Sequence, residues 1–158
     1  MITLEPLTYE AFAPFGDVIE ASGNPSFMIN AGKCGRFHDL AKLEFGTGSA
    51  GVSLADATGY SLPLSLNMIE RHPLGCQMFM PLNDSPFMVV VSEGPEATPR
   101  AFITNGKQGV NYHCGTWHGV LTPLVDSQPF LIVDRIGEGN NLEEHFFKTP
   151  FLIGTPDA

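Results

Sequence analysis

The chain reads Leu64-Ser-Leu-Asn-Met-Ile-Glu-Arg-His72, then Pro73-Leu-Gly75, then Cys76-Gln-Met-Phe-Met80. Apolar residues take every second position from Leu64 to Met68, which is the period of a β-strand with one buried face. The Pro and Gly that follow are typical of a tight turn, and a second β-like run begins directly after it. This stretch therefore predicts two neighbouring strands that are joined by a turn.

Similar short runs recur along the chain. They occupy residues 27–30, 52–55, 64–71, 76–80, 87–92, 100–103, 109–112 and 130–134. Turn-forming residues separate them, as in Asn83-Asp-Ser-Pro86 and Asn105-Gly106. Thr8 is placed to cap one short helix that ends at Phe12. Residues 142–153 fit a terminal strand, a helix or a segment that covers a partner subunit. The pattern predicts an all-β (mainly β) sandwich or barrel with a few short helices.

Composition limits the class of protein. A length of 158 residues fits one domain, 1–158. The chain has 8 basic and 17 acidic residues and a net charge of -9, whereas a nucleic-acid-binding surface is basic. No apolar run approaches the ~18 residues of a membrane helix, and the first residues do not resemble a signal peptide. Cys34, Cys76 and Cys114 form no CxxC motif. We therefore expect a reduced, cytoplasmic protein.

Two polar residues continue the alternating pattern of the first strand. Glu70 and His72 share a face with the apolar residues that precede them, because side chains alternate with period two. A buried charge is costly unless it is paired, hydrogen-bonded or bound to a metal. The pair therefore predicts a polar site inside the fold. The alternative is that Pro73 ends the strand and leaves both side chains in solvent.

A second group of site-like residues follows in Gly109-Val-Asn-Tyr-His-Cys-Gly-Thr-Trp-His118. Two His residues with a Trp between them are unusual in a purely structural strand. Gln77 is expected about opposite Glu70 and His72, if the register of the two strands holds. Glu70, His72, Gln77 and His118 then match the spacing of a four-ligand cupin site, although Gln is a weak ligand. Such nitrogen and oxygen donors suit Zn, Ni, Mn or Fe. The alternative for His118 is a hydrogen-bonded core residue.

Several longer motifs occur in order between about residues 3 and 140. They read Ala13-Pro-Phe-Gly-Asp-Val-Ile19, Ile29-Asn-Ala-Gly32, Arg36-Phe-His-Asp-Leu40, Glu70-Arg-His-Pro-Leu-Gly75, Arg100-Ala-Phe-Ile-Thr-Asn-Gly106, Gln108-Gly-Val-Asn-Tyr-His113 and Val133-Asp-Arg135. In these motifs the chain resembles the ureidoglycolate lyase family of allantoin degradation, long called ureidoglycolate hydrolases. The resemblance implies a cupin-like jelly-roll β-barrel, a homodimer and cleavage of the small anion (S)-ureidoglycolate into glyoxylate and urea. A divalent metal, Ni²⁺ or Zn²⁺, is associated with such a site, and no organic cofactor is expected.

The chain departs from the family pattern at two places. Within 113–118, where members often carry a basic residue, this chain has Cys114. Directly after that segment, where many members carry a second His and then Pro, it has Gly119 and Val120. Any role of those family side chains is therefore absent here.

The implied reaction asks for three functions. Ureidoglycolate carries a hydroxyl, a carboxylate and a ureido nitrogen on one carbon, so its elimination needs a base, an acid and a group that holds the carboxylate. We expect His113 or His118 to be the base and Glu70 to be the acid or a metal ligand. Tyr112 or Trp117 would contact the ureido plane of the substrate, or else would pack in the core or an interface.

Three arginines are candidates for holding the carboxylate, because a guanidinium suits a carboxylate better than an ammonium does. Arg71 points away from Glu70 by strand alternation. Arg135 shares a face with apolar residues, which suggests a buried role or a structural ion pair. Arg36 lies in a Gly-flanked loop that would cover the site or reach a partner subunit. If none of them serves, a bound cation must supply the positive charge in this acidic protein.

Other functions fit parts of the pattern. An amidohydrolase would attack the ureido carbonyl and release ammonia and CO₂ instead of urea. An iron dioxygenase or a sugar isomerase of the cupin class would ordinarily show His-x-His, where this chain has Glu70 and His72. A non-catalytic binding module is the remaining alternative, and the polar residues at the predicted site argue against it.

Overall fold

Two curled β-sheets make up most of the molecule, whose structure is a computed structural model that describes residues 1–155. The first sheet has the order β1 (Leu4–Pro6), β9 (Arg100–Ile103), β8 (Phe87–Ser92), β11 (Trp117–His118), β6 (Leu64–Arg71) and β14 (Glu143–Ile153), with β12 (Thr122–Pro123) paired to β8. The second sheet has the order β2 (Gly16–Ile19), β10 (Gly109–Tyr112), β7 (Gln77–Pro81), β13 (Ser127–Ile136) and β5 (Ser49–Thr58). A separate hairpin consists of β3 (Phe27–Ile29) and β4 (Cys34–Arg36).

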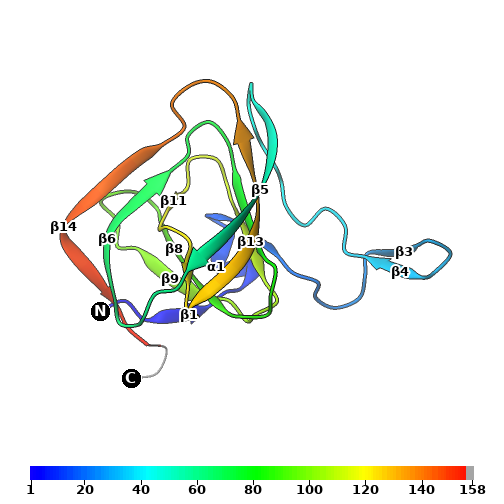
Figure 1. Cartoon of the computed structure of the whole chain (residues 1–158), viewed down its shortest axis with the longest axis horizontal. Coiled ribbons are helices and arrows are strands. Elements are labelled where there is room, and N and C mark those ends of the chain that lie inside the picture. Colours follow the sequence, from blue (N-terminus) through cyan, green and yellow to red (C-terminus); the bar gives the residue numbers. More distant parts are fainter. Residues whose placement is uncertain (156–158) are drawn as a thin grey trace.

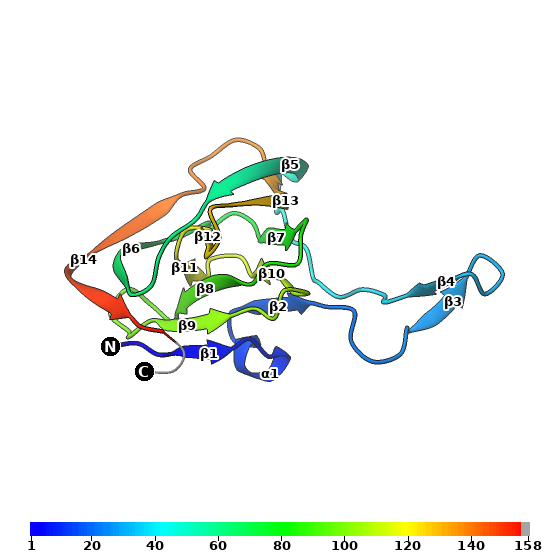
Figure 2. The ribbon, with the colours of Figure 1, turned by 60° about the horizontal axis from the view of Figure 1, so that its bottom comes forward.

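The two sheets curl around a common interior and form a half-barrel (Figure 1). The parallel pair β1–β9 lies at one edge of the first sheet, whereas the paired strands of the second sheet are all antiparallel. The helix α1 (Tyr9–Phe12) lies beside β1 and β2 (Figure 2). The mainly β, cupin-like fold expected from the sequence is confirmed.

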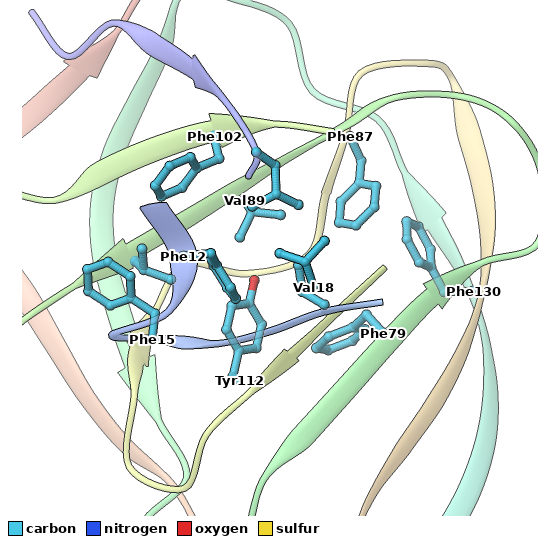
Figure 3. Packing of buried hydrophobic residues seen from close by; sticks show 12 residues of the cluster. Phe12, Phe15, Val18, Phe79, Phe87, Val89, Phe102, Tyr112 and Phe130 are labelled. Atoms are coloured by element: carbon cyan, nitrogen blue, oxygen red, sulfur yellow. The ribbon is translucent and has the colours of Figure 1, made fainter. Parts of the chain in front are cut away.

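Aromatic residues from both sheets fill the interior (Figure 3). Phe87 of the first sheet meets Phe130 of the second edge-to-face, with ring centroids 5.0 Å apart. Burial of such a side chain stabilises the fold by roughly 1.5–3 kcal/mol. The interior cluster consists of Leu7, Phe12, Phe15, Val18, Phe79, Phe87, Val89, Val91, Phe102, Val110, Tyr112 and Phe130.

A second cluster, the outer cluster, packs against the first sheet. Its β8 members lie on the face turned away from the interior, and on β6 it includes both Leu66 and Ile69. Met88 and Val90 belong to it, whereas Val89 and Val91 face the interior, so every residue of β8 is buried. On β6, Ser65 and Asn67 are exposed as the alternation predicts, but Ile69 on the same strand face is fully buried. Ile69 is buried because it packs in the outer cluster. The end of β6 is therefore covered on both faces.

The predicted elements are found, and several are longer than expected. Thr8 caps α1, because its hydroxyl oxygen accepts a hydrogen bond from the Ala11 amide at 3.1 Å. β5 and β13 extend beyond the predicted runs and pair over ten residues each. The ambiguous segment 142–153 is a strand, β14, whose register with β6 shifts between Phe146 and Phe151. The short strands β1, β2, β4, β11 and β12 were not predicted. No helix within residues 1–155 has the length and apolar character to span a membrane.

The hairpin β3–β4 projects from the body of the molecule (Figure 2). Phe27 and Met28 on it are 43% and 55% exposed. The Arg36 guanidinium lies over the Phe27 ring, 5.9 Å from its centroid. The hairpin and its two connecting segments, which follow β2 and precede β5, form an arm.

Candidate active site

Glu70, His72 and His118 come together inside the half-barrel. The short strand β11 lies between β6 and β8, and its His118 is the direct partner of Glu70 across the ladder. Directly opposed residues of antiparallel strands place their side chains on the same face. One ligand atom from each of the three residues lies within 4.8 Å of the others. We call this group the triad, and it contains three of the four metal ligands that the sequence predicts.

Hydrogen bonds fix the tautomer of each triad imidazole. His118 Nδ1 lies 2.8 Å from the Gly119 carbonyl oxygen, and His72 Nδ1 lies 2.8 Å from the Asn141 carbonyl oxygen. Since a carbonyl oxygen only accepts, Nδ1 of each ring carries a proton, and in the neutral form of either ring Nε2 carries the lone pair. Both Nε2 atoms are buried and have no hydrogen-bond partner among the described residues. Metal-ligating His residues show this arrangement, with one nitrogen held by a carbonyl and the other free for the metal.

Burial shifts the protonation of the triad. It lowers the pKa of His118 to about 4, against the opposing effect of the Gly119 carbonyl, and the nearby charge of His72 lowers it further. Burial also raises the pKa of Glu70, an effect that His72 opposes and that Glu144 on the neighbouring strand reinforces. His118 is therefore neutral at pH 7. Two imidazoles and a carboxylate form a donor set that fits a divalent metal and leaves coordination positions open.

Tyr112 lies directly against the triad. Its ring stacks on the His118 imidazole, with centroids 4.2 Å apart and planes 4° apart. Burial raises the pKa of the Tyr112 hydroxyl, and the charge of Glu70 adds to this effect, so the hydroxyl stays protonated. Figure 3 shows the Tyr112 side chain among the aromatic residues of the interior. The stacking fixes the plane of His118, a role that is independent of the predicted contact with substrate.

The predicted pairing of the two strands that flank the turn after His72 is wrong. β6 pairs with β11 and β14, whereas β7 pairs with β10 and β13 in the other sheet, so Gln77 comes from the facing sheet. It pairs with Tyr112 across β7 and β10, and its side-chain Nε2 donates to Asp134 Oδ2 at 3.1 Å. Its assignment as the fourth metal ligand stays a prediction.

His113 lies on the other side of β10 from Tyr112. Its Nε2 lies 3.3 Å from Asp17 Oδ2, and its side chain is partly exposed. Together with Cys114, Thr116 and Trp117 it lines a surface cavity of about 300 Å³. The predicted role of His113 as a base stays a prediction.

The three candidate arginines make contacts away from the triad. Arg71 forms an ion pair with Glu143 at 2.8 Å and lies over the Trp117 ring, 5.0 Å from its centroid. The Arg135 guanidinium donates to two backbone carbonyl oxygens in neighbouring loops. Arg36 lies on the arm. The assignment of these residues, and of Trp117, to substrate binding stays a prediction.

Sequence reasoning did not identify two contributors to the site. Gly119 and Asn141 act through their backbone carbonyls, which every residue possesses. The only sequence signal near Asn141 is the turn-forming run Gly137-Glu-Gly-Asn140.

Comparison with known proteins gives a consistent result over nearly the whole chain. The family model described as ureidoglycolate lyase matches residues 1–154. A ureidoglycolate lyase of Chelativorans sp. (strain BNC1) is 61% identical, over 99% of this chain and 98% of the relative. That of Mesorhizobium japonicum is 53% identical, over 98% of this chain and 98% of the relative. That of Rhodobacter capsulatus is 51% identical, over 96% of this chain and 97% of the relative. The sequence match over nearly the whole length shows that the chain belongs to the ureidoglycolate lyase family.

Proposed function

We propose that this protein is a ureidoglycolate lyase that splits (S)-ureidoglycolate into glyoxylate and urea. In this reaction the hydroxyl oxygen loses its proton and becomes the aldehyde oxygen of glyoxylate. The bond from the same carbon to the ureido nitrogen breaks, and that nitrogen takes up a proton and leaves as urea. The observation that supports the proposal is the triad itself, with two buried Nε2 lone pairs beside a carboxylate, in a chain of this family.

We propose Glu70, His72 and His118 as ligands of a divalent metal, Ni²⁺ or Zn²⁺, with Gln77 as a fourth candidate. An imidazole whose pKa is about 4 is a weak proton acceptor at pH 7, whereas a metal ligand must be neutral. The ligand role therefore suits His118 better than the role of a base. A bound divalent metal would attract the anionic substrate and make its hydroxyl more acidic.

The positions of the basic residues support this assignment. Arg71, Arg100, Lys42 and Lys107 are paired with acidic side chains, and Arg135 is bonded to backbone carbonyls. None of these contacts lies at the triad, which favours a metal, or a residue of a second subunit, as the cation that holds the substrate carboxylate. Glu70 as an acid, with His113 or His118 as the base, is the alternative proposal.

Product analysis tests the reaction. The protein is incubated with ureidoglycolate, and glyoxylate, urea and ammonia are measured separately against a control without enzyme, because the substrate also decays spontaneously. Equal amounts of urea and glyoxylate support the lyase. Ammonia in place of urea would show an amidohydrolase, and products at the spontaneous rate would indicate a binding module.

Substitution of His118 tests the site. His118→Ala should lower kcat/KM at least ~100-fold, because it removes one donor of the triad. His145→Ala is the matched control, since His145 packs against Trp117 and Phe147 on the outer face of the first sheet. Chelator treatment followed by Ni²⁺ or Zn²⁺ should abolish and restore activity. Full turnover by metal-free protein would leave the acid–base alternative.

We propose a homodimer built on the outer face of the second sheet. Phe79, Phe130 and Ile132 face the interior, so strand alternation turns their neighbours outward. Val52 and Leu54 on the edge strand β5 are 72% and 74% exposed. They pair with Val133 and Leu131 of β13, which pair in turn with Met78 and Met80 of β7.

These six residues form one apolar sheet face. We propose a second copy of this chain as its occupant, because a self-complementary face suits a two-fold dimer and the arm beside it carries exposed apolar residues.

The family match over residues 1–154 supports a single domain, 1–158. The free state of Cys34, Cys76 and Cys114 supports a cytoplasmic location.

A further inference from the structure

Asn141 contacts the segment around His72 at two points. Its backbone carbonyl oxygen lies 2.8 Å from His72 Nδ1, and its side-chain Oδ1 accepts a hydrogen bond from the Leu74 amide at 2.8 Å. Leu74 lies in the turn that follows His72, so a single residue holds both the imidazole and the backbone just after it. Asn141 itself belongs to the loop 137–142, which connects β13 to β14.

The loop is fixed at its other end by Arg135. The Arg135 Nη2 donates to the Glu138 carbonyl oxygen at 2.9 Å, and its Nε donates to the Phe45 carbonyl oxygen at 3.1 Å. Gly139 has a φ of +99°, and a Cβ at this position would come within 3.0 Å of the Leu74 side chain. The loop thus packs closely on the turn, and Asn141 has little freedom to move away from His72.

The two contacts of Asn141 depend on each other. The packing of the loop brings the Asn141 peptide near His72, and the side-chain bond to the Leu74 amide adds a direct tie beside its carbonyl oxygen. Loss of that bond would loosen the carbonyl. His72 could then exchange its proton between the two ring nitrogens, because the hydrogen bond at one nitrogen decides which of them carries the proton.

We propose that Asn141 is a positioning residue that keeps His72 in the Nδ1–H tautomer, so that its Nε2 stays free for the triad. The proposal rests on the proposed function only in taking His72 as a site residue. Asn141 touches neither the substrate nor the reacting atoms in this role. It acts through the orientation of the His72 ring and through which ring nitrogen faces the carbonyl.

Two substitutions at this position and one beside it test the proposal. Asn141→Leu removes the acceptor for the Leu74 amide, whereas Asn141→Asp keeps an oxygen at the same place. Asn140→Ala is the matched control, because the Asn140 side chain accepts from the exposed Leu142 amide and not from the turn. Should Asn141→Leu fail to fold in a thermal melt, Asn141→Ser replaces it, since its shorter side chain cannot reach Leu74.

The first measurement is the tautomer of His72, read from long-range ¹⁵N–¹H spectra of histidine-labelled protein without metal or substrate. The wild type, Asn141→Asp and Asn140→Ala should show the proton on Nδ1. Asn141→Leu should show a mixture of tautomers. The second measurement is the affinity for Zn²⁺ by titration calorimetry, which should fall ~10–100-fold in Asn141→Leu and recover in Asn141→Asp.

An unchanged His72 tautomer in folded Asn141→Leu would overturn the proposal, as would an equal loss of Zn²⁺ affinity in Asn140→Ala. The tautomer is read without any reaction. A shifted tautomer in a protein whose wild type does not cleave ureidoglycolate would support the positioning role and reject the proposed function.

Discussion

Asp17 is the carboxylate on which several donors converge. Its Oδ2 accepts from the Lys42 amide at 2.9 Å and from Asn111 Nδ2 at 3.0 Å, and His113 Nε2 lies at 3.3 Å. Burial alone would raise the pKa of Asp17, but the hydrogen bonds from Asn111, the Lys42 amide and His113 outweigh it and hold that pKa below its usual value.

This shift predicts how stability depends on pH. Because the pKa of Asp17 is lower in the folded state than in the unfolded chain, its ionised form stabilises the fold above about pH 4, and this contribution is lost as the pH falls through the folded pKa. Asp17→Asn should therefore cost stability at pH 7 and progressively less as the pH falls through the lowered pKa of Asp17 in the folded state. Urea unfolding at several pH values from 7 downward measures the free energy of unfolding of the variant and the wild type. Asp126→Asn, an exposed carboxylate, is the control, and an Asp17→Asn penalty that does not change with pH would contradict the argument.

At the residue scale, strand alternation was enough to predict most of the triad. It placed Glu70 and His72 on the interior face of β6. The same rule explains the position of His113, because Tyr112 faces the interior and the next residue must face outward, toward Asp17. The carbonyls that fix the two imidazoles were not predictable, since a backbone oxygen has no sequence signature and its position depends on how a loop packs.

At the scale of elements, the turn between β9 and β10 depends on one glycine. Gly106 has a φ of +89°, and a Cβ there would collide with the Asp84 carbonyl oxygen. Gly106→Ala should lower the free energy of unfolding by roughly 1–3 kcal/mol, because both the backbone conformation and the contact are unfavourable. Gly94→Ala is the control, since open space surrounds it. Urea unfolding compares the two, and an equal loss in both would show that the strain is relieved elsewhere.

The elements missed from the sequence are those with the weakest periodic signal. β11 and β12 have two residues each, too few for an alternating pattern. β14 was ambiguous because its register shifts between Phe146 and Phe151, which breaks the period of the apolar residues. β8 also lacks alternation, because both of its faces are buried, yet its unbroken apolar run was enough to predict it. The helix was predictable because Thr8 caps it through its own side chain.

At the scale of the whole molecule, the apolar face of the second sheet predicts the oligomeric state. Introducing two charges by the double substitution Val52→Glu and Leu54→Glu should turn a dimer into a monomer, because buried unpaired carboxylates are costly. Light scattering after size-exclusion chromatography measures the mass. Leu152→Glu is the control, since Leu152 is also partly exposed but lies on β14 of the first sheet. A dimer that survives the double substitution would place the interface elsewhere, and a monomeric wild type would reject the homodimer.

The pairing of the basic side chains away from the triad has a consequence for how fast substrate arrives. With a net charge of -9 and no guanidinium at the triad among the described contacts, an anion approaches against a repulsive field. Added salt shortens the range of that field from ~30 Å at 0.01 M to ~8 Å at 0.15 M ionic strength. The kcat/KM for ureidoglycolate should therefore rise as sodium chloride is added at fixed pH. In an enzyme that draws its anionic substrate in with arginines, salt has the opposite effect, and a fall here would reveal a cationic entrance.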